Sequence, residues 1–205
     1  MVFWLAWHAP VALVQELPAS NDEVAIAAFK TGVESFQLKQ FDAAVKALTE
    51  VPELGGYLSL YKHWYLGQAY LELGKYKEAE PEFGKITHGA ASSELKYQAQ
   101  YFLGETALRQ KKYHEAITRL APLEKKWRRS YRSPEVIYRL MFADLKLGNT
   151  ASACRRVHKL YTKYPAHPLV ISWGSELKQI EVDVKKLPCN GERNDFSERV
   201  RSLQW

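Results

Sequence analysis

Cysteine is scarce, and the side chains that carry enzyme chemistry stand in no recognisable catalytic arrangement. The sequence has two cysteines in 205 residues, and they lie 35 positions apart, too far for a Cys-x-x-Cys metal motif. Six histidines are scattered singly, without a His-Glu-x-x-His, Gly-x-Ser-x-Gly or Gly-Lys-Ser run. We therefore expect no catalytic constellation, no metal site and no cofactor. We also expect each histidine to be exposed or near a helix end, and Glu78 and Glu82 to be surface charges.

Long hydrophobic runs are also missing. The most apolar stretch, residues 1–14, is shorter than the ~20 residues of a membrane-spanning helix, and His8 and Pro10 interrupt it. No Lys or Arg precedes this stretch, so it meets the signal-peptide pattern only in part. Two interpretations of residues 1–21 stay open: a signal remnant, or a helix that packs on the rest of the chain. We expect no transmembrane span.

The composition indicates a helical domain. Hydrophobic residues make up 46% of the chain and charged residues 25%, and the helix-forming types dominate. Alternation of apolar and polar residues with period two is absent, and Gly and Pro concentrate between helical segments. These features predict an all-α fold.

A repeated pattern of small and large apolar residues runs along the chain. The alanines of the pattern are spaced by 35, 37 and 37 residues: Ala44, Ala79, Ala116 and Ala153. A second small residue precedes three of them with the same spacing, as Gly32, Gly67 and Gly104, with Met141 in the fourth copy. A large apolar residue follows each alanine by four positions, as Leu48, Phe83, Leu120 and Val157. Small residues are required where two helices cross closely, so the pattern predicts packed helix pairs.

The segment from Trp64 to Phe83 resembles the tetratricopeptide repeat (TPR). Its matching residues are Gly67, Tyr70, Gly74, Ala79 and Phe83. The resemblance implies a TPR-like helical-hairpin solenoid, a right-handed α-superhelix of about four repeats with additional terminal helices. We assign residues 22–168 to the repeats, 1–21 to an apolar N-terminal segment and 169–205 to C-terminal helices. The last segment ends within an expected helix, as a truncated chain would.

The resemblance also implies a binding groove. An aromatic residue stands three positions before each first small residue: Phe29, Trp64, Tyr101 and Tyr138. In the TPR family this position faces the concave side. The neighbouring groove positions carried over from the family are Gln68, Leu71 and Glu72, then Glu105 and Arg109, then Phe142. These residues would bind a protein or peptide partner. The alternative is that the aromatics form the apolar seam between repeats.

The net charge of +6 is unevenly distributed. The basic residues of two consecutive repeats form a candidate patch: Lys125, Lys126, Arg128, Arg129, Arg132, Arg155 and Arg156. Such a patch attracts an anionic partner, or it is simply a solvated face. Nucleic acid is the disfavoured partner, because no base-reading motif accompanies the charge.

A second resemblance is to the α-superhelical, non-catalytic part of bacterial soluble lytic transglycosylases. The similar segments are 92–104, 159–168 and 196–203. This resemblance implies a periplasmic or cell-envelope location, whereas the other possibility is the cytoplasm. It leaves two functions open: a scaffold that docks a partner segment, or a superhelix that positions peptidoglycan or a separate catalytic domain. The order Ser197-Glu198 reverses the family's catalytic Glu-Ser motif, so no catalytic glutamate is assigned.

The cysteines have two possible states. Cys154 follows Ala153 of the repeat pattern, which favours a buried thiol, because free cysteine is among the most buried residue types. A disulfide to Cys189 is the alternative in an oxidising compartment.

Overall fold

The computed structural model describes residues 21–52, 56–89 and 91–172. Over these ranges the chain forms helices and no strand, which confirms the all-α prediction. The labelled helices are α1 (Asn21–Gln37), α2 (Phe41–Glu50), α3 (Tyr57–Glu72), α4 (Tyr76–His88), α5 (Ser93–Arg109), α6 (Tyr113–Lys126), α7 (Ser133–Lys146) and α8 (Thr150–Lys163). They form four helical hairpins in the described part of the chain, and residues 168–172 are helical as well.

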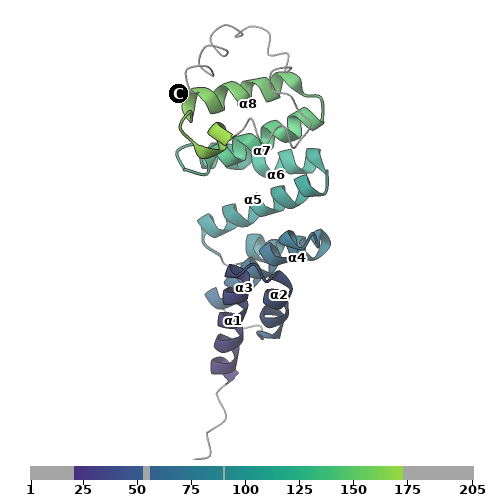
Figure 1. The fold of residues 1–205 in the computed structure, drawn as a ribbon, viewed down its shortest axis with the longest axis vertical. Coiled ribbons are helices and arrows are strands. Elements are labelled where there is room, and N and C mark those ends of the chain that lie inside the picture. Colours follow the sequence, from purple (N-terminus) through teal and green to yellow (C-terminus); the bar gives the residue numbers. More distant parts are fainter. Residues whose placement is uncertain (1–20, 53–55, 90, 173–205) are drawn as a thin grey trace, which may run out of the picture.

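The hairpins follow one another in chain order along the long axis of the molecule (Figure 1). The second helix of each hairpin packs on the first helix of the next, as α4 packs on α5 and α6 on α7. The first helices of successive hairpins also contact one another directly, α3 with α5 and α5 with α7. Because each hairpin buries its apolar side only against its neighbours, α3, α5 and α7 form one continuous face.

The glycines of the repeat lie where the two helices of a hairpin cross. A Cβ added to Gly32 would lie 2.5 Å from Leu48 Cγ, and one added to Gly104 would lie 2.5 Å from Leu120 Cγ. At Gly67 the nearest atom would be Phe83 Cε1, at 2.7 Å. These distances are far below van der Waals contact, so only glycine permits the observed approach. The packing role predicted for the pattern is confirmed.

The other pattern residues form the core. Ala44, Ala79, Ala116, Ala153 and Met141 are fully buried. The core is continuous across hairpin boundaries: one cluster joins α4 to α5 and another joins α5 and α6 to α7.

Each hairpin turn contains one residue with positive φ. These residues are Lys39, Gly74, Lys111 and Gly148, and they repeat with the same 35, 37 and 37 spacing as the alanines. Lys39 and Lys111 have φ of 59° and 62°, a conformation that costs a residue with a Cβ roughly 1–2 kcal/mol. The turn geometry is therefore set by the hairpin as a whole, even where glycine is absent.

Cys154 is disulfide-bonded, so the predicted buried thiol is wrong. The other cysteine of the sequence, Cys189, lies outside the described residues. The same holds for the interpretations of residues 1–20 and for the C-terminal helices beyond residue 172, and the assigned domain limits stay predictions.

None of the helices within residues 21–52, 56–89 and 91–172 combines the length and the apolar character needed to cross a membrane.

Candidate functional site

A cavity of about 280 Å³ opens on the face formed by the first helices. Its lining comes from the end of α3, from α5, from α7 and from the turn between α6 and α7. The lining residues are Leu71, Glu72, Tyr101, Phe102, Glu105, Arg109, Tyr131, Arg132, Glu135 and Arg139. The cavity thus spans three consecutive hairpins, and its shape depends on how they stack.

Aromatic rings form one part of the lining. Tyr101 is 4% exposed and packs edge-on against Phe102, with 5.3 Å between ring centroids. Phe102 in turn packs against Trp64 at 5.1 Å and stacks on Phe83 at 5.4 Å. Tyr101 and Phe83 are buried and Phe102 and Trp64 are half-buried against the core, whereas Tyr131 is 74% exposed. The cavity therefore has a fixed aromatic wall and one aromatic side chain that water reaches.

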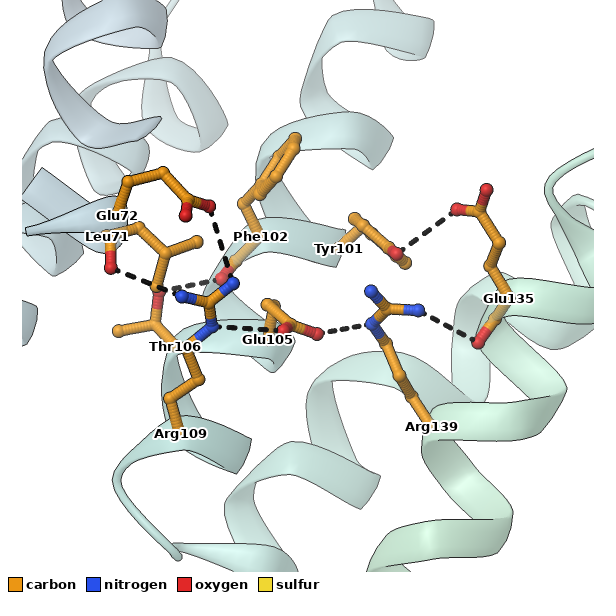
Figure 2. A network of polar contacts seen from close by, with 9 residues as sticks. All are labelled: Leu71, Glu72, Tyr101, Phe102, Glu105, Thr106, Arg109, Glu135 and Arg139. Carbon is orange, nitrogen blue, oxygen red and sulfur yellow. Dashed lines mark hydrogen bonds and ion pairs between the residues drawn. The ribbon is translucent and has the colours of Figure 1, made fainter. Parts of the chain in front are cut away.

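An ion-pair network crosses the cavity from α3 to α7 (Figure 2). Glu105 on α5 lies between two arginines: Arg109 Nε donates to its Oε1 at 3.2 Å, and Arg139 Nε donates to its Oε2. Arg109 also reaches α3, where its Nη2 lies 3.3 Å from Glu72 Oε1. Arg139 lies on α7, so the network ties the first helices of three hairpins together.

The protonation states of the network are fixed at neutral pH. Burial alone would raise the pKa of Glu105, but Arg139 and then Arg109 hold that pKa below its ordinary value. Burial raises the pKa of Tyr101, and the nearby Glu135 carboxylate adds to the increase. Tyr101 therefore stays protonated and donates its hydrogen bond to Glu135 Oε2 at 3.2 Å. The network is a fixed frame of charges and donors.

Arg132 differs from the other two arginines of the cavity. Its guanidinium lies 5.7 Å from the ring centroid of Trp127 and 5.6 Å from that of Tyr131. Its Nε donates to Tyr131 Oη at 3.0 Å. Among the residues that the structure describes, no carboxylate forms an ion pair with Arg132.

The structure divides the groove residues expected from the sequence. It brings five of them into the cavity: Leu71, Glu72, Tyr101, Glu105 and Arg109. The remaining ones lie elsewhere on the first helices: Phe29, Trp64, Gln68, Tyr138 and Phe142. Tyr138 is 9% exposed and Tyr101 is 4% exposed. Their burial is what the alternative interpretation expects, in which the repeated aromatics form the apolar seam between repeats.

Sequence reasoning missed four lining residues: Phe102, Tyr131, Glu135 and Arg139. A signal for Arg139 is present in the sequence. Glu105 and Arg139 are 34 residues apart, about one repeat, so opposite charges at that spacing on first helices meet across the stack. Glu72 and Arg109 show the same relation at 37 residues.

The predicted basic patch is not uniform. Lys125, Arg128, Arg129 and Arg155 are exposed, and Lys126 lies over the Tyr97 ring at 5.7 Å. Arg156, in contrast, is bound between α6 and α7, where it pairs with Asp144 and with Glu124. Its charge is neutralised inside the protein, so the exposed cations concentrate around the turn between α6 and α7.

One histidine was placed wrongly from the sequence. His63 is 5% exposed, and its Nδ1 lies 2.7 Å from Glu82 Oε2. Glu82 also accepts from Lys85 Nζ at 3.1 Å, and its side chain is 13% exposed, so it is not a surface charge. Burial opposes ionisation of Glu82, but the hydrogen bonds from His63 and Lys85 lower its pKa. The His63–Glu82 pair links α3 to α4, and this structural role explains why both side chains are largely buried.

The His63 pair also extends to a hydroxyl. Ser59 Oγ lies 3.5 Å from His63 Nε2, one turn away on the same helix. This order of side chains resembles an acyl-transfer triad, but 3.5 Å is too long for an activating hydrogen bond. Ser59 also lies about 18 Å along α3 from Leu71 of the cavity, at ~1.5 Å per residue. The described residues contain no group of three His, Cys, Asp or Glu side chains able to hold a metal ion.

Comparisons with known proteins agree with this architecture. Residues 29–94 match the tetratricopeptide repeat family, and residues 93–172 match an outer membrane lipoprotein family. A solved structure titled "MamA MSR-1 C2" has a similar fold, with a TM-score of 0.57 and 18% identity, covering 86% of this chain and 98% of that one. No curated protein matches the sequence. The repeat spacing, the close-packed hairpins and the match of residues 29–94 together show a TPR-like helical-hairpin fold.

Proposed function

We propose that the protein is a non-catalytic scaffold that binds a segment of a partner protein in the cavity on the face of α3, α5 and α7. The cavity itself carries the proposal. Tetratricopeptide-repeat domains serve as protein-interaction scaffolds, and this cavity combines rigid buried rings with fixed charged groups. Rigid aromatic rings provide a large contact area at a small cost in conformational entropy. Arginines that are held in ion pairs add directional hydrogen-bond donors.

The cell envelope is the proposed location. The match of residues 93–172 to an outer membrane lipoprotein family supports it, and that range includes the segment 159–168 and all but the first residue of 92–104, two segments that resemble lytic transglycosylases. The disulfide at Cys154 supports it too, because disulfides persist in oxidising compartments such as the bacterial periplasm.

Two tyrosines allow a matched test. Tyr131 at the cavity is 74% exposed and Tyr57 at the start of α3 is 73% exposed, so replacing either with serine removes the same ring at the same exposure. Tagged wild type, Tyr131→Ser and Tyr57→Ser are each used to capture partners from a solubilised envelope extract. We expect the same protein with wild type and Tyr57→Ser, and its loss with Tyr131→Ser.

Two outcomes contradict the proposal. If Tyr131→Ser captures the same proteins as wild type, the cavity is not the docking site. If the wild type instead sediments with purified peptidoglycan sacculi, and Tyr131→Ser does not, the cavity holds glycan strands and the protein-scaffold proposal is wrong.

A further inference from the structure

Of the three arginines that line the cavity, Arg132 is the one without an ion-pair partner among residues 21–52, 56–89 and 91–172. Arg109 and Arg139 share the carboxylate of Glu105, and Arg109 has Glu72 as a second partner. The Arg132 guanidinium lies over the rings of Trp127 and Tyr131, and its Nε donates to the hydroxyl of Tyr131. A partly buried guanidinium that has no acidic partner in the described part of the chain can pair with a carboxylate from a ligand.

The surroundings hold Arg132 in place for such a ligand. The rings of Trp127 and Tyr131 lie at similar distances from the guanidinium, and both attract its positive charge. Its Nε donates to Tyr131, so a ligand would bind to the two terminal nitrogens. Two parallel hydrogen bonds from a planar guanidinium match the geometry of a carboxylate.

The basic residues around the turn between α6 and α7 also favour an acidic ligand. No Asp or Glu occurs between Glu124 and Glu135, while five Lys and Arg residues do. Residues 91–172 as a whole carry 16 Lys and Arg against 6 Asp and Glu. This excess creates a positive potential at the cavity mouth, which raises the local concentration of an acidic segment. Inside the cavity, Glu72 and Glu105 are paired with arginine, and the Glu135 carboxylate accepts from the neutral hydroxyl of Tyr101. The lining thus holds three carboxylates and three guanidinium groups, and the positive excess lies around the turn at its mouth.

We infer that the cavity recognises an acidic peptide segment, in which an Asp or Glu side chain pairs with Arg132 and an adjacent apolar side chain packs on Tyr101 and Phe102. The inference rests on the proposed scaffold function and specifies its partner's chemistry. The charged residue stays near the exposed Tyr131, and the apolar one enters deeper, against the buried rings.

Three synthetic peptides of equal length test this inference. All have blocked termini, a fluorescent label and one central phenylalanine, flanked by Asp and Glu, by Asn and Gln, or by Lys. Fluorescence anisotropy is measured with the full-length protein at two salt concentrations. We expect binding of the acidic peptide alone, weakening as salt increases.

Variants at two arginines separate a specific site from general charge. Arg132→Gln should weaken binding of the acidic peptide about tenfold or more, because a charge-assisted pair is lost. Arg132→Lys keeps the charge without the planar fork, so it should fall between Arg132→Gln and wild type. The control Arg155→Gln removes the same charge from an exposed site on α8 and should change the affinity about twofold or less. Circular dichroism melts check that each variant is folded.

Each contrary result has a distinct meaning. Equal losses with Arg132→Gln and Arg155→Gln would show diffuse attraction and overturn the inference. Binding of the Asn and Gln peptide, abolished by Tyr131→Ser, would overturn the acidic preference while the scaffold proposal stands. No binding by any peptide overturns the inference. So does an Arg132-dependent preference for single-stranded oligonucleotide or for phosphatidylglycerol vesicles.

Discussion

Gly104→Ala should destabilise the protein, although alanine is the better helix former. The added methyl would lie 2.5 Å from Leu120 Cγ and from Leu120 Cδ2. Since Cγ is the branch point of the side chain, rotating its tip does not relieve the clash, and α5 and α6 must move apart. Overpacking of this kind costs about 1–3 kcal/mol, against a helix-propensity gain of about 1 kcal/mol. The net loss is roughly 1 kcal/mol, or a fall in Tm of about 2–4 °C for a chain of this size.

Gly84→Ala is the matched control. It makes the same change inside α4, where the added methyl has no neighbour within 4 Å. It should stabilise the protein by about 0.5–1 kcal/mol, because only the propensity gain remains. Thermal and urea unfolding, followed by circular dichroism at 222 nm, measure both variants. If Gly104→Ala stabilises as much as Gly84→Ala does, the close helix crossing is not a feature of the protein in solution, and the reasoning from the repeat fails.

Three further predictions concern the turns, the network and the aromatics. Lys111→Gly should stabilise the fold by about 0.5 kcal/mol in urea unfolding, because relief of the left-handed conformation outweighs the entropy of glycine; a loss of stability would contradict the φ of 62°. Glu105→Gln should cost about 2 kcal/mol, since it leaves Arg139 partly buried and unpaired. The pKa of Glu105 is lowered in the folded state, so its contribution is present above the pKa of the unfolded chain and is lost as the pH falls through the folded value. The difference in Tm between wild type and Glu105→Gln should therefore close in acid, and a constant difference down to about pH 3 would refute the assignment. The double variant Trp64→Ala and Tyr101→Ala should lower the free energy of unfolding by about 3–5 kcal/mol per aromatic, and Tm should fall strongly with it. Loss of partner binding with an unchanged Tm would show instead that both rings serve only to contact the partner.

The fold could be predicted because its main constraint is local and periodic. A glycine or alanine is required wherever two helices cross closely, and such crossings recur every 35 to 37 residues. Gly67 and Ala79 therefore identify a hairpin from the sequence alone. The turn position follows from the same repeat, and it persists at Lys39 and Lys111, where the side chain itself gives no turn signal.

The cavity could be predicted only in part. Leu71 and Arg109 follow from the family register, but the partner of Glu105 depends on how far one hairpin rotates relative to the next. The place of Arg132 depends on the turn between α6 and α7, whose conformation no repeat pattern encodes. The pairing of His63 with Glu82 was likewise invisible, because two residues 19 apart on different helices meet only when the hairpin closes.

Photocrosslinking in living cells tests the central claim, that the cavity is where the partner docks. Benzoylphenylalanine is introduced in place of Tyr131 in one strain and in place of Tyr57 in another, two sites of nearly equal exposure. After irradiation, a discrete adduct to one partner protein should form from position 131 and not from position 57. Equal adducts from both positions, or an adduct from position 57 alone, would contradict the account.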